Sequence, residues 1–338
     1  MSAPVVTVGM VGLGGWGKNL LRNFGSLPGA DLRWCCDADE ATRAAHAPAH
    51  PGARFTASYD ELLADPDLQA IVLATPVPTH FELARRAILA GKHVMVEKPM
   101  TWTAAEAREL RDLVTGSGLV LMVDHLLRFH PGVEKLRELV DSGELGDVRY
   151  VYGNRLNLGR IRPDENVLWS LGVHDVSVVL HLIDSEPVEV WARGESYVQP
   201  DVEDVAFAYV RFASGQVGHL HLSWLDPHKM RKMTVIGSRK MAVFDDMEPD
   251  RKVTVYDKGD VQTPAGRIST HTGDIWAPRI DPREPLAIAC THFLEAVATG
   301  RPARTDVDEG VRVVELLEAM QTSLDRGGET IALGAAAR

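Results

Sequence analysis

Cysteine is scarce in this chain, long apolar runs are missing, and basic residues are outnumbered by acidic ones. The three cysteines, Cys35, Cys36 and Cys290, have the spacing of neither a disulfide framework nor a zinc site. No apolar run has the length of a membrane span, and the first residues lack the features of a secretory leader. A formal net charge of −11 argues against nucleic acid or an anionic membrane as the main partner. We therefore expect a cytoplasmic protein that binds neither.

A glycine-rich turn follows the first predicted strand. The apolar run over residues 5–11 leads into a Gly-x-Gly-x-x-Gly pattern, and residues 18–24 are typical of a helix. In this pattern the first glycine permits a tight turn, the second lets the backbone approach a pyrophosphate, and the third lets helix and strand pack closely. The helix N-terminus offers free N–H groups to the phosphates. We expect the residues of the turn to contact a dinucleotide: Gly12, Leu13, Gly14, Gly15, Trp16 and Gly17.

An acidic residue follows the second predicted strand. Alone, the glycine pattern also fits a structural turn, a flavin site or a methyltransferase, but residues 30–36 read as a strand that ends in Asp37. A carboxylate at this position hydrogen-bonds the adenosine ribose hydroxyls and repels a 2′-phosphate. Ala38 and Asp39 supply no basic group to accept that phosphate. The sequence therefore predicts NAD, in preference to NADP, as the cofactor.

Two patterns of secondary structure divide the chain. Up to residue 124 strands and helices alternate, with apolar runs over 70–74, 93–96 and 119–123 that are typical of buried parallel strands. Further on, short turns join several predicted strands between residues 149 and 244. We expect an α/β fold, with a Rossmann-type doubly wound parallel sheet over 1–124 and an α+β domain with a large, mostly antiparallel open sheet over 125–338. Residues 257–285 show no periodicity and are expected to form a long loop.

The sequence Glu97-Lys98-Pro99 directly follows the strand predicted over 93–96. Open α/β sheets bind ligands beyond the carboxyl ends of their strands, so this position directs Lys98 toward the cofactor crevice. An ordinary surface lysine at a strand end is the alternative. Thr75 and Pro76 end the preceding strand at the same level.

The glycine turn, residues 74–80 and residues 97–99 resemble motifs of the glucose–fructose oxidoreductase / inositol dehydrogenase (Gfo/Idh/MocA) family. The resemblance covers essentially the whole chain. The resemblance implies an NAD-dependent oxidoreductase that acts on CH–OH groups. The lysine matched by Lys98 reaches both the nicotinamide ribose and the substrate in this family. Family members assemble through the open sheet, which implies a homodimer or homotetramer here. Other residues implied at the cofactor are Thr75, Pro76, His80 and Glu97.

The resemblance extends to residues 166–175, which match a family helix that carries a catalytic histidine, here His174. A free imidazole titrates near pH ~6.5 and a free lysine near ~10.4, so His174 is the expected base and Lys98 the electrostatic partner of the reacting oxygen. Many members have an aspartate one helical turn earlier, where this chain has Ser170, and serine supplies no carboxylate. Asp175 is interpreted as a cap, a packing partner or a substrate contact.

Residues 154–166, 223–227 and 273–278 resemble a branch of the family that oxidises C3 of nucleotide-linked amino sugars, including UDP-N-acetylglucosamine 3-dehydrogenases and their uronic-acid relatives. Guanidinium groups of Arg160 and Arg162 would suit a diphosphate, or else form a solvated basic turn. The implied substrate site contains Lys98, Asn157, Arg160, Arg162, Trp169, His174 and Asp175.

The implied activity is oxidation of a secondary hydroxyl of such a sugar by NAD, in polysaccharide biosynthesis. A dehydrogenase or ketoreductase for inositol, a free sugar or a nucleotide-linked keto-sugar is one alternative, and a non-catalytic dinucleotide-binding regulator is another. No metal is expected, because His219 and His221 share one strand face without an evident third ligand.

Overall fold

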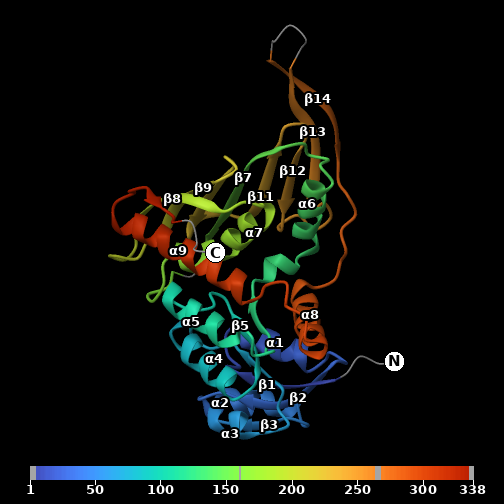
Figure 1. Cartoon of the computed structure of the whole chain (residues 1–338), viewed down its shortest axis with the longest axis vertical. Helices are drawn as coiled ribbons and strands as arrows, with labels where there is room; N and C mark the ends of the chain where they lie inside the picture. The colour runs from blue at the N-terminus through green and yellow to red at the C-terminus, as the bar shows by residue number, and fades with distance from the viewer. Residues whose placement is uncertain (1–4, 160, 263–267, 335–338) are drawn as a thin grey trace. The chain divides into compact units, whose positions relative to one another are not determined.

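The structure is a computed structural model that describes residues 5–159, 161–262 and 268–334. The chain divides into two compact units, the first formed by Met1–Phe129 and Arg283–Glu315, the second by His130–Pro282 and Leu316–Arg338. Each unit contains its own sheet (Figure 1). The sequence predicts one domain boundary, at residue 124, which lies near the first division. Residues 283–315, however, belong to the first unit, whereas the prediction assigns them to the second domain.

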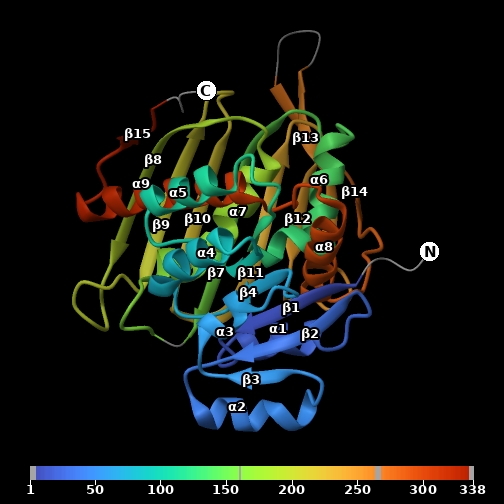
Figure 2. The ribbon, with the colours of Figure 1, turned by 60° about the horizontal axis from the view of Figure 1, so that its bottom comes forward.

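The sheet of the first unit has six strands in the order β3-β2-β1-β4-β5-β6, and neighbouring strands run parallel. Figure 2 shows β1, β2 and β3 side by side. This order is the doubly wound arrangement of dinucleotide-binding folds, so the predicted α/β class is confirmed. The strands are β1 (Val6–Val11), β2 (Ala30–Cys36), β3 (Arg54–Thr56), β4 (Ala70–Leu73), β5 (His93–Glu97) and β6 (Leu121–Asp124).

Helices alternate with these strands, as the sequence predicts. Helix α5 begins at a capping box in which the Thr103 hydroxyl accepts a hydrogen bond from the Glu106 N–H and the Glu106 carboxylate accepts one from the Thr103 N–H. Three short 3₁₀ helices, at Ala47–Ala49, Val77–Thr79 and Leu126–Phe129, lie among the connections. The α-helices are α1 (Gly17–Phe24), α2 (Glu40–His46), α3 (Tyr59–Ala64), α4 (His80–Leu89) and α5 (Ala104–Val114).

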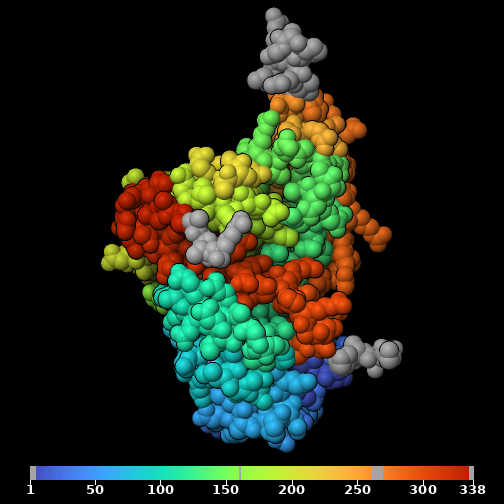
Figure 3. Space-filling view, viewed as in Figure 1, coloured from blue at the N-terminus to red at the C-terminus, as the bar shows by residue number. Residues whose placement is uncertain are grey.

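Helix α8 (Pro285–Thr299) explains why a distant segment belongs to the first unit. Its apolar residues join the core beneath the sheet, where Phe293 meets Phe24 of α1 edge to face with ring centroids 6.4 Å apart. Cys290 is fully buried beside them. In Figure 3 the orange-red atoms of this segment adjoin blue atoms of the N-terminal residues. Burial of this apolar face against α1 holds α8 on the first unit.

The sheet of the second unit has nine strands in the order β14-β13-β12-β11-β7-β10-β9-β8-β15. Neighbours are antiparallel except β7 and β10, which confirms a mostly antiparallel sheet. The strands are β7 (Val148–Leu158), β8 (Pro187–Glu195), β9 (Val205–Phe212), β10 (Val217–Ser223), β11 (Leu225–Gly237), β12 (Met241–Asp245), β13 (Val253–Gln262), β14 (Ile268–Trp276) and β15 (Ile331–Ala332).

The expectation of a long loop over residues 257–285 is wrong. Strands β13 and β14 pair antiparallel across this region, with Val255 opposite Trp276. The sequence hides the pairing because β14 is an edge strand whose residues 269, 270 and 272–275 are all exposed. A strand exposed on both faces needs no alternation of apolar and polar residues, so the periodicity that reveals other strands is missing.

Helices α6 (Pro131–Asp141) and α7 (Val173–Leu182) cover one face of this sheet, α7 against β7 and α6 against β12 and β13. Five residues of π-helix, Leu168–Gly172, lead into α7. Helix α9 (Val307–Asp325) spans the division between the units, and Ser323 near its end accepts a hydrogen bond from Ala192 of β8. Within the described ranges, no helix has the length and apolar character needed to cross a membrane.

Candidate active site

The glycine turn between β1 and α1 combines crowded and open positions. Gly12 has φ +85°, and a Cβ there would lie 2.6 Å from the Ala74 carbonyl oxygen. A Cβ on Gly17 would lie 2.1 Å from the Gly12 carbonyl oxygen. By contrast, a Cβ on Gly14 or Gly15 would meet no atom of the described chain within 4 Å. The first and third glycines therefore serve the protein's own packing, whereas the open pair leaves room for phosphates at the N-terminus of α1.

Asp37 lies at the carboxyl end of β2 and is fixed by the turn itself. The Leu13 N–H donates a hydrogen bond of 2.8 Å to Oδ2, and the Asp39 N–H donates one of 2.9 Å to Oδ1. Sequence reasoning missed Arg43, whose guanidinium donates to the Asp37 and Ala38 carbonyls. Arg43 thus binds the backbone carbonyls beside Asp37, and the side-chain carboxylate lies next to the turn, where the fold places a group for ribose hydroxyls.

Lys98 follows β5 at a cis Lys98–Pro99 peptide bond. Glu97, at the end of β5, lies opposite Asp124 of β6, and its Oε2 accepts the Lys98 N–H at 3.2 Å. Burial raises the pKa of both carboxyls, and the nearby charge of Asp124 raises that of Glu97 further. The positive charge of Lys98 acts in the opposite direction and lowers the pKa of both carboxyls.

His80, for which the family resemblance implies a cofactor contact, is surrounded by the protein's own backbone. Its ring is fully buried, and its two nitrogens lie 2.9 Å from the Pro99 carbonyl and 2.8 Å from the Thr75 carbonyl. His80 therefore ties together the two loops that carry Thr75 and Lys98 and is a positioning residue. Thr75 is half-buried, Pro76 is exposed, and Trp16 is 45 % exposed at the glycine turn.

His125, which the sequence analysis did not single out, directly follows the carboxyl pair at the end of β6. Burial lowers the pKa of this histidine to about 3, with smaller effects from the charges of Arg128 and Lys98. The imidazole is therefore neutral and adds no charge beside Lys98.

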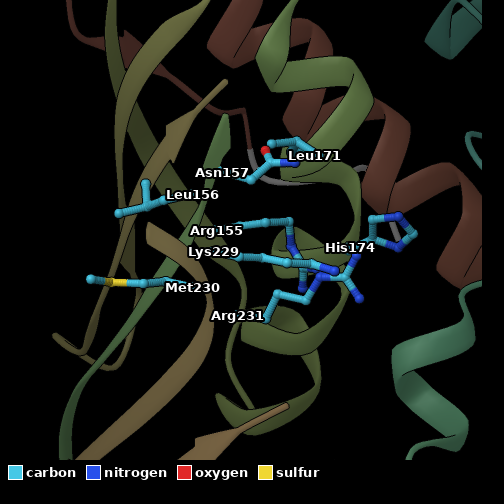
Figure 4. A pocket seen from close by; sticks show the side chains of 8 residues that line it. All are labelled: Arg155, Leu156, Asn157, Leu171, His174, Lys229, Met230 and Arg231. Atoms are coloured by element: carbon cyan, nitrogen blue, oxygen red, sulfur yellow. The ribbon is translucent and has the colours of Figure 1, made fainter. Parts of the chain in front are cut away.

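The second unit contains a pocket on the helix-covered face of β7 and β11, and His174 of α7 lines it (Figure 4). Asn157 Oδ1 is buried there without a hydrogen-bond partner among the described residues. Leu171 belongs to the π-helical segment directly before α7. Such segments often mark functional sites because they redirect side chains relative to a regular helix. The full lining is Arg155, Leu156, Asn157, Leu171, His174, Lys229, Met230 and Arg231.

Asp175, next to His174, forms a buried ion pair with Arg155 of β7. The Arg155 Nε lies 2.5 Å from Oδ2 and Nη2 lies 3.2 Å from Oδ1, while the side chains are only 10 % and 3 % exposed. Both carboxylate oxygens are engaged in a bidentate pair. This geometry favours a packing role for Asp175 over a direct substrate contact, which was among the interpretations of its sequence position.

The other substrate residues implied by the sequence have different surroundings. Arg160 lies outside the described residues, and Arg162 is paired with Glu165. Trp169 is buried, and its indole N–H donates to Gln321 of α9. Lys98 belongs to the first unit and His174 to the second. Sequence reasoning missed Arg155, Lys229 and Arg231, although the alternation of the last two along one strand was a visible signal.

Within the described parts of the chain, no group of three His, Cys, Asp or Glu side chains could hold a metal ion. His221 stacks on Phe207 across β9 and β10, with centroids 4.5 Å apart. That contact accounts for one of the two histidines on this strand.

Comparisons with known proteins agree with this geometry. Residues 6–125 match the model of an oxidoreductase family with an NAD-binding Rossmann fold, and residues 133–243 match the GFO/IDH/MocA C-terminal domain. The chain is 31 % identical over 309 residues to a UDP-N-acetylglucosamine 3-dehydrogenase of Acidithiobacillus ferrooxidans, covering 90 % of this chain and 93 % of that protein. It is 27 % identical to a scyllo-inositol 2-dehydrogenase (NAD(+)) of Bacillus subtilis, covering 91 % of each.

Among solved structures, GenD2 from gentamicin A biosynthesis in complex with NAD aligns with a TM-score of 0.84 at 27 % identity, covering 99 % of this chain and 98 % of GenD2. The A. ferrooxidans 3-dehydrogenase GnnA aligns with a TM-score of 0.81 at 28 % identity, covering 95 % and 98 %. These matches, with the open glycine turn and Asp37, establish NAD as the cofactor and an oxidoreductase as the class of enzyme. The chain belongs to the GFO/IDH/MocA family of NAD-binding oxidoreductases.

Proposed function

We propose that this enzyme oxidises a secondary hydroxyl, at C3, of a nucleotide-linked amino sugar such as UDP-N-acetylglucosamine. The observation that carries the proposal is the pocket in which His174 lies with Asn157 and several cationic side chains. A histidine and an unpaired amide oxygen suit sugar hydroxyls, and cations suit a nucleotide's phosphates. The relatives named 3-dehydrogenases support the choice of substrate.

In this mechanism His174 takes the proton from the substrate hydroxyl as the carbon loses its hydride. Lys98 donates a hydrogen bond to the same oxygen and stabilises the negative charge that develops on it. NAD, when bound, accepts the hydride. Glu97 accepts a hydrogen bond from the Lys98 backbone N–H and so helps to position Lys98 at the end of β5. Asp175 acts through Arg155, whose guanidinium it fixes behind the pocket.

The proposal is tested by incubating the protein and NAD with a panel of UDP-sugars, free sugars and inositols, following NADH absorbance. Removal of the keto product by a coupled aminotransferase draws an unfavourable oxidation forward. Lys98→Met and His174→Ala should each lower kcat/KM by about 10²–10⁴-fold, as loss of a general acid–base group does. His46→Ala, in the exposed helix α2, is the control for loss of a histidine.

Turnover that survives both substitutions would refute these roles. Preferential oxidation of inositol would instead support the alternative of an inositol dehydrogenase, an activity that the scyllo-inositol 2-dehydrogenase represents among the relatives. NAD binding without turnover of any sugar would favour a regulator.

We also propose that the protein forms a homodimer or homotetramer in the cytoplasm through the face of the large sheet opposite α6 and α7. Exposed rings lie on that face, with Tyr150 41 % and Phe207 40 % exposed, where they alternate with buried residues along β7 and β9. Tyr150 stacks on Tyr152 with centroids 6.1 Å apart. Covering such rings with a second copy would remove apolar surface from water. The three cysteines are free and buried, which suits a reducing compartment.

A further inference from the structure

Cationic side chains are concentrated on one face of β7 and β11. In Figure 4 the side chains of Arg155, Lys229 and Arg231 extend from the strands toward His174, whereas those of Leu156 and Met230 extend in the opposite direction. The chain as a whole is acidic, with a net charge of −11. A local excess of positive charge in an acidic protein therefore needs a cause specific to this pocket.

The register of the two strands places like charges together. Arg231 lies directly opposite Arg155 in the antiparallel pair of β11 and β7. Like charges at directly opposite positions destabilise a sheet. Lys229 is two residues before Arg231 and shares its face, because side chains alternate along a strand. The fold thus keeps three cations near one another despite their repulsion.

Carboxylates compensate only part of this charge. Asp175 pairs with Arg155, and Asp246 lies 3.3 Å from Arg231 but also contacts Lys252 and His130. Within the described residues, Lys229 forms no ion pair or hydrogen bond and its side chain is exposed at the pocket. The Arg231 side chain is 42 % exposed. These two groups are accessible to a ligand, whereas Arg155 is held in its buried pair.

We infer that Lys229 and Arg231 bind an anionic oxygen group of the substrate, a phosphate or a carboxylate, inside the pocket that His174 lines. The inference rests on the proposed function, since it takes this pocket as the substrate site. A guanidinium binds such a group through two parallel hydrogen bonds, and an ammonium adds a point charge. Asn157 Oδ1 accepts a hydroxyl of the same molecule. The substrate of this enzyme is therefore an anion, and neutral sugars are poor substrates.

The test compares charged and neutral ligands on the full-length protein. Three arms separate the sources of charge: UDP-N-acetylglucosamine carries phosphates, N-acetylglucosaminuronic acid carries only a carboxylate, and N-acetylglucosamine and myo-inositol are neutral. Binding is measured by calorimetry and turnover by NADH formation, each for the wild type, Lys229→Met and Arg231→Met.

Lys232→Met is the matched control. Lys232 lies on the same strand and its loss changes the net charge equally, but it pairs with Asp245 at 3.0 Å and points away from the pocket, opposite Asn154. We expect Lys229→Met and Arg231→Met to weaken binding of the preferred anionic ligand about 10- to 100-fold, as loss of a charged hydrogen bond does. Lys232→Met should leave binding unchanged, and added NaCl should weaken wild-type binding.

Equal effects of Lys229→Met and Lys232→Met would overturn the inference, as would neutral sugars that bind and react as well as their charged counterparts. The latter result would leave the proposed dehydrogenase activity standing. Conversely, Lys229-dependent binding of an anionic sugar without NADH formation would support the anion site and contradict the proposed reaction. Preference for the uronic acid over the nucleotide sugar would identify the anion as a carboxylate.

Discussion

Breaking the Arg155–Asp175 pair should destabilise the second unit strongly. Both side chains are almost fully buried, so removal of one partner leaves the other without compensation in a low-dielectric site. Loss of Asp175 also leaves Arg155 facing Arg231 across the strands. We expect Asp175→Leu or Arg155→Met alone to cost about 3–5 kcal/mol. An exposed pair such as Arg85–Glu109, with side chains 38 % and 52 % exposed, should contribute at most about 1 kcal/mol.

The double variant separates the ion pair from simple loss of packing. Arg155→Met with Asp175→Leu replaces two buried charges by apolar side chains, which is often close to neutral for stability. Hydrogen exchange of amides in β7 and α7, followed by mass spectrometry, reports the opening free energy of this region. We expect each single variant to speed exchange at least about a hundredfold, and the double variant to restore most of the protection. Single effects that simply add would refute the coupling of the two charges.

The remaining predictions concern the first unit and the sheet face. Gly14→Ala should weaken NAD binding about tenfold or more by calorimetry without lowering Tm, because its Cβ enters open space, whereas Gly17→Ala should lower Tm. Burial raises the pKa of Glu97 and Asp124 in the folded protein, so their protonated forms favour folding. This contribution to stability is complete at pH values below the pKa values of the unfolded chain, and it is lost as the pH rises through the pKa values of the folded protein. Asp124→Asn should flatten this fall in urea titrations between pH 5 and 9. Phe207→Asp should lower the mass found by light scattering, and an unchanged mass would exclude this face as the interface.

Local signals predicted the first unit well. The glycine turn, the apolar strands and the capping box at Thr103 each depend on residues that are close in sequence, and the structure contains all three. The return of α8 was not predictable in the same way, because the contact of Phe293 with Phe24 joins residues at opposite ends of the chain. An amphipathic helix shows that it has an apolar face but not which partner covers that face.

The pocket was only partly predictable for a related reason. His174 and Asn157 were identified by resemblance, but Arg155, Lys229 and Arg231 meet through the register of β7 with β11. That register shifts between Leu225 and Met230, and such an irregularity decides which residues of β11 face the pocket. The π-helical turn before α7 is also invisible in the sequence, although it sets the geometry between Ser170 and His174.

The charges around His174 determine what the serine at position 170 means for catalysis. When the imidazole takes the substrate proton, it adds a positive charge to a pocket that already contains three cationic side chains. Ser170 provides no carboxylate, and the carboxylate of Asp175 is bound to Arg155. A substrate anion held by Lys229 and Arg231 offsets the new charge by Coulomb attraction, which strengthens in a partly buried site. An anionic substrate should therefore raise kcat as well as lower KM, and neutral analogues should lose both.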